Sequence, residues 1–337
     1  MLFLYDLLRP LLFQFDAEFA HKLVLKVIKK VPLLIPKHEP PQLCEREFLG
    51  VKIQSPLILA AGFDKEGLYF PYLARLGFGG IEVGTFTPKA QVGNPRPRLF
   101  RLPHQKALLN RMGFNNPGIE VGLKNILRNI HQVPKHFILG VSLGKSRDTP
   151  IEKAFGDYAM MLQYLDKNLP AKNIYITLNI SSPNTALLQE LQKRELFESL
   201  LKNLPTTRFP LLVKLSFELK KEDLRQILQL CQRSKKIAGI ILTNTASDPT
   251  FIRNLTGQEL QGGISGEPLR EGSRNLLKLA HSLESKLTLV SSGGVMDPQE
   301  AYERLQLGAQ AVQIYTGLIY YGPYFVRDFH QLLIEQA

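Results

Sequence analysis

Cysteine is scarce in this sequence, and long apolar runs are missing. Its 337 residues include only two cysteines, Cys44 and Cys231, whose separation fits no metal-binding or redox motif. The chain therefore encodes no disulfide framework, and a reducing cytosol is the expected compartment. Because no apolar run reaches about 18 residues, no segment is expected to span a bilayer.

Acidic residues are outnumbered by basic ones. The chain has 30 aspartates and glutamates against 42 lysines and arginines, which gives a net charge of +12. Such a surplus favours acidic partners, which include nucleic acid, anionic lipid and anionic substrates, although an ordinary basic soluble protein has the same composition. The length allows a large core, as one α/β domain or as two smaller ones.

Residues 1–36 have a composition of their own. Leucine and phenylalanine dominate residues 1–15, and Asp16 is a suitable N-cap for a second helix. On that helix Phe19, Leu23, Val24, Val27 and Ile28 recur at helical spacing opposite Lys22, Lys26, Lys29 and Lys30, before Pro32 and Pro36 end it. The segment lacks the basic start and the cleavage site of a signal peptide. Two interpretations remain open: an element that docks on a membrane surface, or a helical pair whose apolar faces pack on the main domain.

From about Leu57 onward, strands alternate with helices. Apolar runs predict strands at Leu57–Ala60, Gly80–Val83, Phe137–Ser142, Ile174–Asn179, Leu211–Leu215, Gly239–Thr243, Leu287–Ser291 and Ala311–Tyr315. Amphipathic stretches predict helices at Lys65–Leu76, Ile119–His131, Glu152–Lys167, Glu190–Asn203, Lys221–Ser234, Glu271–Ser285, Pro298–Leu307 and Tyr324–Glu335. This alternation is typical of an α/β chain that forms a (β/α)8 TIM barrel, and the evenly apolar strands favour closure over a doubly wound sheet. The two long connections, 84–118 and 244–270, are suited to binding residues or lids.

Polar or glycine residues follow nearly every predicted strand. They include Lys65, Thr85, Ser142, Asn179, Lys214, Thr243, the pair Gly293 and Gly294, and the pair Thr316 and Gly317. In a barrel of this class the carboxyl ends of the strands form the active site, so these residues together predict a lined ligand pocket. The glycines after the last two strands suit a phosphate, although isolated glycine turns are common. Lys65 and Lys214 would neutralise an anionic substrate or a flavin charge.

The stretch Asn179-Ile180-Ser181-Ser182-Pro183-Asn184-Thr185 directly follows a predicted buried strand. Carboxamides both donate and accept hydrogen bonds, which suits planar amide or carboxylate ligands. A turn that merely caps the strand is the plainer interpretation. The polar residues at the other strand ends favour the binding function.

Six motifs, in order along the chain, are similar to those of dihydroorotate dehydrogenases. They are Ala60-Ala61-Gly62-Phe63-Asp64-Lys65, Gly93-Asn94-Pro95-Arg96-Pro97-Arg98, Asn110-Arg111-Met112-Gly113-Phe114-Asn115, Asn179–Thr185, Thr243-Asn244-Thr245 and Gly263-Ile264-Ser265-Gly266. The apolar N-terminal helices with Asp16–His21 resemble the membrane-associated, quinone-using class 2 branch. Ser182 agrees, because class 1 enzymes place a cysteine at the position of the base.

The resemblance implies a flavoprotein with one FMN per chain that oxidises (S)-dihydroorotate to orotate in de novo pyrimidine (UMP) biosynthesis. It implies flavin contacts for Ala61, Gly62, Thr85, Ser142, Asn179, Lys214, Thr243, Gly266, Gly294, Tyr315 and Thr316. Substrate contacts are implied for Lys65, Asn110, Arg111, Met112, Gly113, Phe114, Asn179, Asn184, Asn244 and Thr245. Ser182 would remove the C5 proton and pass it on through water, because an alcohol is a poor base, while hydride leaves C6 for flavin N5.

The resemblance also implies a division of the chain and a set of partners. Residues 1–36 would form a quinone-tunnel and membrane-docking element, and residues 37–337 the FMN-binding barrel. A membrane quinone would reoxidise the flavin near His21 and Arg101. We expect a monomer without metal or nucleic-acid ligands, peripheral on the cytoplasmic face of a bacterial inner membrane and held to anionic lipid by its N-terminal helices.

Three places depart from the family pattern. Ser142 and Ser146 stand where the family has asparagine, Phe217-Glu218 replaces a Pro-Asp pair, and Ser291-Ser292 replaces Gly-Val before the phosphate glycines. The shorter reach of Ser142 weakens the case for its direct contact with flavin or substrate. Because Lys214, Gly293 and Gly294 are retained, we expect FMN binding to persist with an altered affinity.

Two other functions fit part of the sequence. The first is another FMN barrel, such as a class 1 relative or a tRNA dihydrouridine synthase. The net charge of +12 would suit tRNA, but this function needs a cysteine acid near the flavin and a separate RNA-binding surface with base-stacking aromatics, neither of which is evident. A membrane-surface scaffold that has lost catalysis would explain the serine substitutions, whereas the intact Asn179–Thr185 stretch argues against it.

Overall fold

The predicted barrel is present. The computed structural model describes residues 3–170, 173–283 and 286–336, and eight parallel strands close on themselves in the order β3-β4-β7-β8-β9-β10-β12-β13. Their bounds are β3 Leu57–Leu59, β4 Gly80–Phe86, β7 Ile138–Leu143, β8 Ile174–Asn179, β9 Leu211–Leu215, β10 Gly239–Leu242, β12 Thr288–Ser292 and β13 Ala311–Ile314. Each strand begins within one residue of its predicted start, because buried apolar runs bounded by turn residues leave little freedom for the start of a strand.

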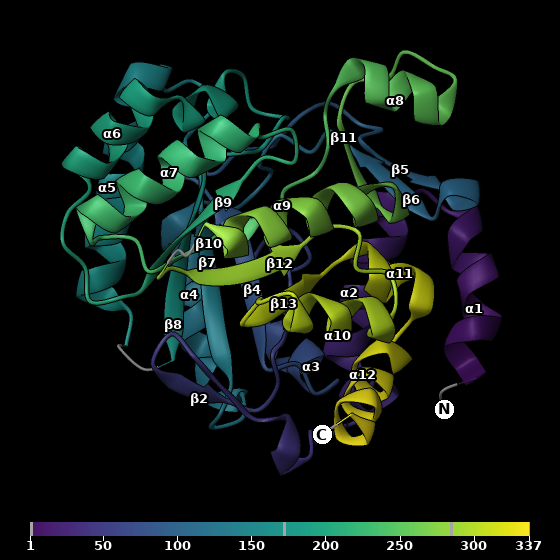
Figure 1. The fold of residues 1–337 in the computed structure, drawn as a ribbon. Coiled ribbons are helices and arrows are strands. Elements are labelled where there is room, and N and C mark those ends of the chain that lie inside the picture. The colour runs from purple at the N-terminus through teal and green to yellow at the C-terminus, as the bar shows by residue number, and fades with distance from the viewer. Residues whose placement is uncertain (1–2, 171–172, 284–285, 337) are drawn as a thin grey trace.

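Helices surround the barrel on its outside (Figure 1). They are α3 Phe70–Ala74, α4 Ile119–Asn129, α5 Ala154–Asn168, α6 Arg194–Asn203, α7 Lys221–Ser234, α9 Arg270–Ser282, α10 Pro298–Gln306, α11 Thr316–Tyr321 and α12 Tyr324–Glu335. Short 3-10 turns occupy Pro32–Leu34, Gln42–Cys44, Pro103–Gln105, Ile130–Gln132, Ile151–Lys153, Leu188–Gln192 and Glu267–Leu269. The helices predicted at Lys221–Ser234 and Tyr324–Glu335 are confirmed to the residue. The one predicted from Glu190 begins only at Arg194, because Leu188–Gln192 forms a separate 3-10 turn. The one predicted to reach Ser285 ends at Ser282, and residues 284–285 lie outside the described residues.

The predicted helix Lys65–Leu76 is wrong over more than half of its length, since only α3, Phe70–Ala74, is helical. The cause is Asp64, a buried carboxylate that accepts hydrogen bonds from the backbone N–H groups of Glu66, Leu68, Tyr69 and Phe70. Aspartate side chains compete with a helix for backbone groups in this way. The result is an ordered loop that carries Lys65 beside the end of β3.

A hairpin fills the amino-terminal end of the barrel. Strands β1 Arg46–Phe48 and β2 Val51–Ile53 pair antiparallel. Phe48 and Ile53 pack inside a cluster that also contains Ile58, Ile138, Tyr175, Leu212, Ile241, Val290 and Ala311. These side chains face the barrel interior and make it a packed core at this end. Space for a ligand is therefore left at the carboxyl ends of the strands.

The two long connections come together over that open end. They contribute β5 Leu99–Leu102, β6 Ala107–Asn110 and β11 Gly263–Gly266, which form a three-stranded antiparallel sheet in the order β11-β6-β5. The register pairs Gly263 with Asn110, so segments 153 residues apart in sequence meet at the rim. Helix α8, Pro249–Thr256, lies above β11 in Figure 1. Both insertions therefore lie at the open end of the barrel, where the sequence predicted that they carry binding residues.

Two helices precede the barrel, as predicted: α1 Phe3–Gln14 and α2 Ala17–Lys30, with Asp16 capping α2 through the N–H of Phe19. In Figure 1, α1 lies at the edge of the molecule beside β5, β6 and α11. The side chains of Tyr5 and Arg9 donate hydrogen bonds to the carbonyl groups of Ile319 and Tyr320 on α11. Helix α1 is thus attached to the helix that follows the last barrel strand.

Only one face of α2 packs on the barrel. Ala17, Glu18, Ala20, Leu25 and Ile28 are buried. Eleven large apolar side chains of the N-terminal segment are exposed: Leu7, Leu8, Leu11, Phe15, Phe19, Leu23, Val24, Val27, Val31, Leu33 and Leu34. We call these eleven residues the N-terminal apolar surface. The alternative in which both helices cover their apolar faces against the main domain therefore does not hold. Over the described residues, no helix combines the length and the apolarity needed to cross a membrane.

Candidate active site

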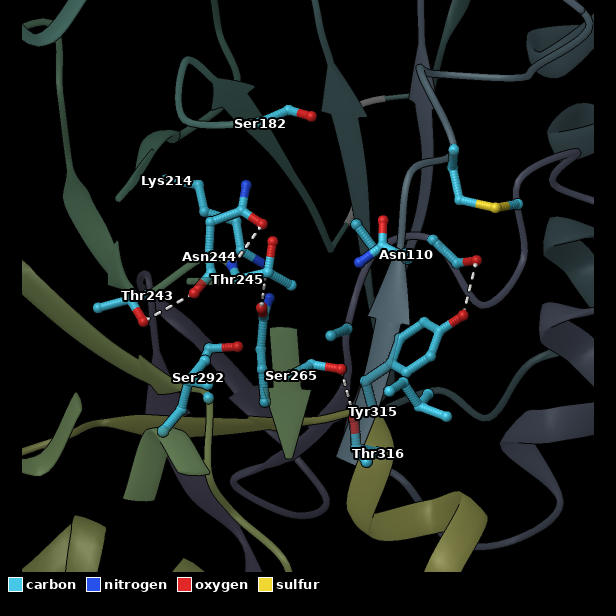
Figure 2. A pocket seen from close by; sticks show the side chains of 18 of the residues that line it. Asn110, Ser182, Lys214, Thr243, Asn244, Thr245, Ser265, Ser292, Tyr315 and Thr316 are labelled. Atoms are coloured by element: carbon cyan, nitrogen blue, oxygen red, sulfur yellow. Dashed lines mark hydrogen bonds between the residues drawn. The ribbon is translucent and has the colours of Figure 1, made fainter. Parts of the chain in front are cut away.

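One pocket lies at the carboxyl end of the barrel, where the sequence placed the ligand site. Residues of all three kinds expected there line it: the proposed base Ser182, the two lysines Lys65 and Lys214, and the glycines Gly293 and Gly294. Figure 2 shows Lys214, Asn244 and Thr245 on one side of this pocket and Asn110 and Tyr315 on the other. Further predicted contacts among its lining residues are Ala61, Gly62, Thr85, Met112, Gly113, Phe114, Asn179, Asn184, Thr243, Gly266 and Thr316.

Four asparagine carboxamides form two pairs in the pocket wall. Asn184 Nδ2 donates to Asn110 Oδ1 at 3.0 Å, and Asn110 Nδ2 donates to the carbonyl of Gly263 at 3.1 Å. In the second pair, Asn244 Nδ2 lies 3.3 Å from Asn179 Oδ1, and Asn179 Nδ2 donates to Thr85 Oγ1 at 3.0 Å. These bonds fix which end of each amide is a donor. The wall therefore presents oriented donors and acceptors to a planar ligand.

Ser182 lies on the loop after β8 and lines the pocket, with only 7% of its surface exposed to solvent. Within the described residues, the Ser182 hydroxyl oxygen accepts a hydrogen bond from the backbone N–H of Asn184 at 3.4 Å. No carboxylate or imidazole of the described part is hydrogen-bonded to Ser182. A proton taken up by this hydroxyl must therefore leave through a water molecule or a ligand group.

Both lysines of the pocket are desolvated. Burial lowers the pKa of Lys65 to about 8, and Lys65 Nζ donates to the carbonyl of Gly62 at 2.8 Å. Burial also lowers the pKa of Lys214, while the negative charge of Glu82 opposes that shift. Lys214 Nζ donates to Gln313 Oε1 at 3.3 Å. Two ammonium groups in a confined pocket favour a ligand or cofactor that carries negative charge.

The glycine turn after β12 forms a cradle of unpaired donors. Within the described part of the chain, the backbone N–H groups of Gly293 and Gly294 donate to no protein acceptor. Gly294 has a φ of 73°, and a Cβ atom there would lie 2.3 Å from the backbone of Arg270, so only glycine lets the turn approach α9 this closely. Free backbone N–H groups beside a helix start suit a phosphate.

Arg304 stabilises the glycine turn through hydrogen bonds and gives a role to Ser291, one of the departures from the family pattern. Its guanidinium is fully buried and donates to Ser291 Oγ at 3.0 Å and to Ser273 Oγ at 2.9 Å. Ser273 Oγ in turn donates to the carbonyl of Gly293 at 2.7 Å. Glu300 Oε1 balances the charge of Arg304 at 2.6 Å. Ser291 therefore faces α10 and supports the turn, whereas Ser292 lines the pocket.

A flavin mononucleotide fits these features. The free amides of the cradle suit its phosphate, Lys214 suits the negative charge on its ring system, and the aromatic ring of Tyr315 lines the same pocket. The pocket also has room for polar contacts at Thr85, Thr243 and Thr316, each at the end of a different strand. The residues present therefore match the group that the sequence resemblance implies.

Two residues with predicted contacts lie outside the lining of the pocket. Ser142 is fully buried behind it and bonds to Thr85 Oγ1 at 2.9 Å, so it acts on the pocket through Thr85. Arg111 turns outward and donates from Nη2 to the carbonyl of Pro97 at 2.8 Å. A sequence motif places a residue in a strand or a loop but does not give the direction of its side chain, which explains both positions.

The two predicted quinone contacts lie between the N-terminal helices and the barrel. Burial lowers the pKa of His21 to about 4, so this side chain is neutral at physiological pH, and its Nε2 lies 2.9 Å from the carbonyl oxygen of Phe63. The ring of Phe63 contacts the ring of Tyr315 at a centroid distance of 5.4 Å. Arg101 donates to the carbonyl of Phe15 at 2.7 Å and stacks on Phe13 at 4.7 Å. An aromatic path thus joins α2 to the pocket.

Several pocket residues were not recognised from the sequence. Ser265, Ser292 and Gln313 line the pocket, and Glu82 lies directly beneath it. Gln313 and Glu82 stand inside predicted strands, where alternation of inward and outward positions was a usable signal. Ser265 accepts a hydrogen bond from Thr316 Oγ1 at 2.9 Å, a contact between segments 51 residues apart that no local pattern encodes.

Known proteins resemble this chain over nearly its whole length. The family model described as Dihydroorotate dehydrogenase matches residues 43–336. "Dihydroorotate dehydrogenase (quinone)" of Janthinobacterium sp. (strain Marseille) is 38% identical over 343 residues, which cover 96% of each protein. The protein of the same name from Azoarcus sp. (strain BH72) is 40% identical over 336 residues, covering 96% of this chain and 97% of that protein. The crystal structure of DHODH in complex with ferulenol from Eimeria tenella superposes with a TM-score of 0.85 at 31% identity, covering 95% of this chain and 91% of that one.

Proposed function

Because this chain belongs to the dihydroorotate dehydrogenase family, we propose that it oxidises (S)-dihydroorotate to orotate with a quinone as the final electron acceptor. This reaction serves de novo pyrimidine biosynthesis. The observation that carries the proposal is that a single pocket combines Ser182, two pairs of asparagine carboxamides, two lysines and a cradle of free backbone donors. A planar acid and a phosphorylated cofactor need these groups side by side.

The carboxamides and Lys65 are suited to the substrate. Dihydroorotate carries one carboxylate and two ring amide groups, so it needs a cation together with paired donors and acceptors. Lys65 supplies the cation, and Asn110, Asn179, Asn184 and Asn244 supply the amides. Fixed side chains of this kind orient the substrate before reaction, which lowers the entropic part of the barrier. Met112, Gly113, Phe114 and Thr245 complete the proposed substrate contacts.

Ser182 takes the proton from C5 of the substrate in this proposal. The Ser182 hydroxyl can accept that proton only if it releases its own, and Asn184 offers it a donor and not an acceptor. Water in the pocket is therefore the proton acceptor. The burial of Ser182 keeps bulk solvent away from the reacting carbon.

The proposed cofactor is FMN, one per chain. The cradle of Gly293 and Gly294 would hold its phosphate, and Lys214 would neutralise the charge of its ring system. Further contacts are proposed at Ala61, Gly62, Thr85, Asn179, Thr243, Gly266, Tyr315 and Thr316, with Ser142 acting through Thr85. Bound flavin supplies the two-electron redox chemistry that none of these side chains can provide.

Residues 1–36 form the proposed docking and quinone-binding element of a peripheral membrane protein on the cytoplasmic face of a bacterial inner membrane. The N-terminal apolar surface offers the area that enters lipid, and the lysines of α2 offer attraction to anionic headgroups. His21 and Arg101 would meet the quinone, with Phe63 and Tyr315 between them and the pocket. Residues 37–337 would form the FMN-binding catalytic barrel, and the whole protein would act as a monomer.

Purified protein tests the proposal with dihydroorotate and two separate acceptors, a short-chain quinone and fumarate. We expect yellow protein, turnover with the quinone and little with fumarate. Ser182→Ala should retain bound flavin and lose most of the turnover, whereas Ser199→Ala on the outer helix α6 should match wild type. Failure of dihydroorotate to bleach the flavin would overturn the proposal, and equal use of fumarate would overturn the quinone assignment.

A further inference from the structure

A glutamate side chain is enclosed in the barrel beneath the pocket. Glu82, on β4, has no exposed surface. Its Oε2 atom accepts three hydrogen bonds: from Tyr175 OH at 3.1 Å, from Thr177 Oγ1 at 2.9 Å and from Gln313 Nε2 at 2.8 Å. Its other oxygen, Oε1, is buried without a hydrogen-bond partner in the described structure. Three donors on one oxygen favour the ionised form of a carboxylate, and a buried carboxylate costs folding free energy unless a positive charge lies near.

A glycine on the neighbouring strand leaves the space that the Glu82 side chain occupies. Gly140, on β7, is aligned with Glu82 on one side and with Tyr175 on the other. A Cβ atom at Gly140 would lie 2.4 Å from the ring of Tyr175 and 2.9 Å from Cγ of Glu82. Only glycine leaves space for both side chains at this level. Below them the interior is filled by the apolar cluster of the hairpin end, so the carboxylate has no route to solvent from that side.

Gln313 connects the carboxylate to the pocket. A carboxylate is only an acceptor and an ammonium is only a donor, so the orientation of the Gln313 amide follows without ambiguity. Its Nε2 faces Glu82 at 2.8 Å, and its Oε1 faces Lys214 Nζ at 3.3 Å. Among the described residues, Gln313 accepts the hydrogen bond of the Lys214 ammonium, whose remaining N–H bonds are left for the pocket.

We propose that Glu82 is a positioning residue that acts through Gln313 to keep Lys214 charged and aimed into the pocket. This role rests on the proposed function, because Lys214 is the residue that would face the flavin. Burial of Lys214 favours its neutral form, and the negative charge of Glu82 opposes this effect, which is consistent with the geometry. The other titratable groups around the network are Lys65 and Tyr315 in the pocket lining and Tyr175 beside Glu82.

The first test measures the Lys214 amine and needs no flavin. Flavin-free full-length protein is treated with acetic anhydride between pH 6 and pH 10, and acetylation of Lys65 and Lys214 is followed by peptide mass spectrometry. At pH 7, E82Q should raise the acetylation rate of Lys214 at least about tenfold, which corresponds to a loss of one pKa unit, without changing that of Lys65. Thr177→Val removes another donor from the same Glu82 oxygen but leaves Gln313 in place, and should leave both rates unchanged. Equal Lys214 rates in E82Q and wild type would refute the inference.

The second test uses the midpoint potential of bound flavin at pH 6 and pH 9. A merely nearby negative charge lowers the potential, so its removal would raise the potential at both pH values. If Glu82 acts by keeping Lys214 charged, E82Q must lower the potential at pH 9, because a positive charge near the flavin is lost. Gln313→Leu keeps the Glu82 charge but breaks the connection, and should lower the potential in the same direction. A raised or unchanged potential in both variants would overturn the role of Glu82 while leaving the enzymatic function intact, whereas wild-type protein that takes up no flavin would overturn the proposed function alone.

Discussion

Replacing Glu18 with glutamine tests what holds the N-terminal helices on the barrel. Arg98 donates from Nε and Nη2 to the two carboxylate oxygens at 2.9 Å each, and Lys22 Nζ lies 2.9 Å away. Burial alone would raise the pKa of Glu18, but the hydrogen bonds from Arg98 and Lys22 outweigh it and lower the pKa to about 2. Glutamine keeps the shape of the side chain and removes its charge, so it isolates the ionic part of this anchor.

We expect this substitution to cost about 3 kcal/mol of the free energy that holds α2 on the barrel. Removing one partner of a buried ion pair costs about 3–5 kcal/mol, because the other charge is left buried. The lower end applies here, since Arg98 retains the carbonyl oxygens of Val92 and Asn94 as acceptors and the side chain of Lys22 is 44% exposed. Local opening of α2 should then become roughly a hundredfold more frequent.

Amide hydrogen exchange across Ala17–Lys30 measures this opening directly. The matched control is Glu198→Gln, which removes the same charge from an exposed ion pair with Arg194 on α6 and should cost less than about 1 kcal/mol. Exchange in α2 of the Glu18 variant that equals wild type would show that apolar packing alone holds the helix, and the reasoning would fail.

Acidification gives an independent check on the same anchor. The folded-state pKa of Glu18 is lowered from 4.5 to about 2. Its contribution is therefore fully present above about pH 4.5 and is lost as the pH falls through about 2. Exchange in α2 of the wild type should accelerate in this window, whereas the Glu18→Gln variant should show no such additional step.

Three further predictions concern the pocket and the membrane surface. Because the pKa of Lys65 is about 8, the KM for dihydroorotate should be constant below pH 8 and rise above it by up to about tenfold per pH unit; a flat KM up to pH 9.5 would exclude Lys65 as the carboxylate partner. Arg304→Lys should keep the ion pair with Glu300 but lose the two hydrogen bonds to Ser291 and Ser273. The Kd of FMN should then rise about tenfold, while the Kd of riboflavin, which has no phosphate, stays constant. Equal changes for both flavins would contradict a role of Arg304 at the phosphate. The double substitution Phe19→Asp and Leu23→Asp should abolish salt-sensitive binding to anionic vesicles. The control Met160→Asp, at a similarly exposed apolar position on α5, should leave this binding unchanged. Retained binding in the double variant would show that the N-terminal apolar surface does not contact the membrane.

Much of the barrel could be predicted because its signals are local. Each barrel strand is a short apolar run followed by polar or glycine residues, and the helix over Lys221–Ser234 has four buried positions at helical spacing. The pocket followed from a fold rule, since parallel strands in a closed barrel bring their carboxyl ends together. Lys65, Asn110, Asn179, Ser182 and Lys214 therefore lie in one pocket although they are spread over 149 residues of sequence.

Side-chain direction was the limit of this prediction. Arg111 and Ser142 belong to segments that reach the pocket, yet one points outward to Pro97 and the other lies behind Thr85. The predicted helix after Asp64 failed for a related reason, because a single buried carboxylate captured the backbone donors that a helix needs. Periodicity describes where apolar residues recur, and it carries no information about such competition.

The sequence by itself determined the order of strands and helices, the apolar N-terminal segment and the polar residues at each strand end, because these depend on neighbours within a few positions. Only the tertiary structure decided which side chains meet. Glu82 bonds to Gln313, which is 231 residues away, and Glu18 bonds to Arg98, 80 residues away. These contacts depend on strand register and on barrel closure, which set the level of every inward side chain. Local sequence patterns cannot encode that geometry, because the hydrogen bonds beneath the pocket form only when the eight strands close into a barrel.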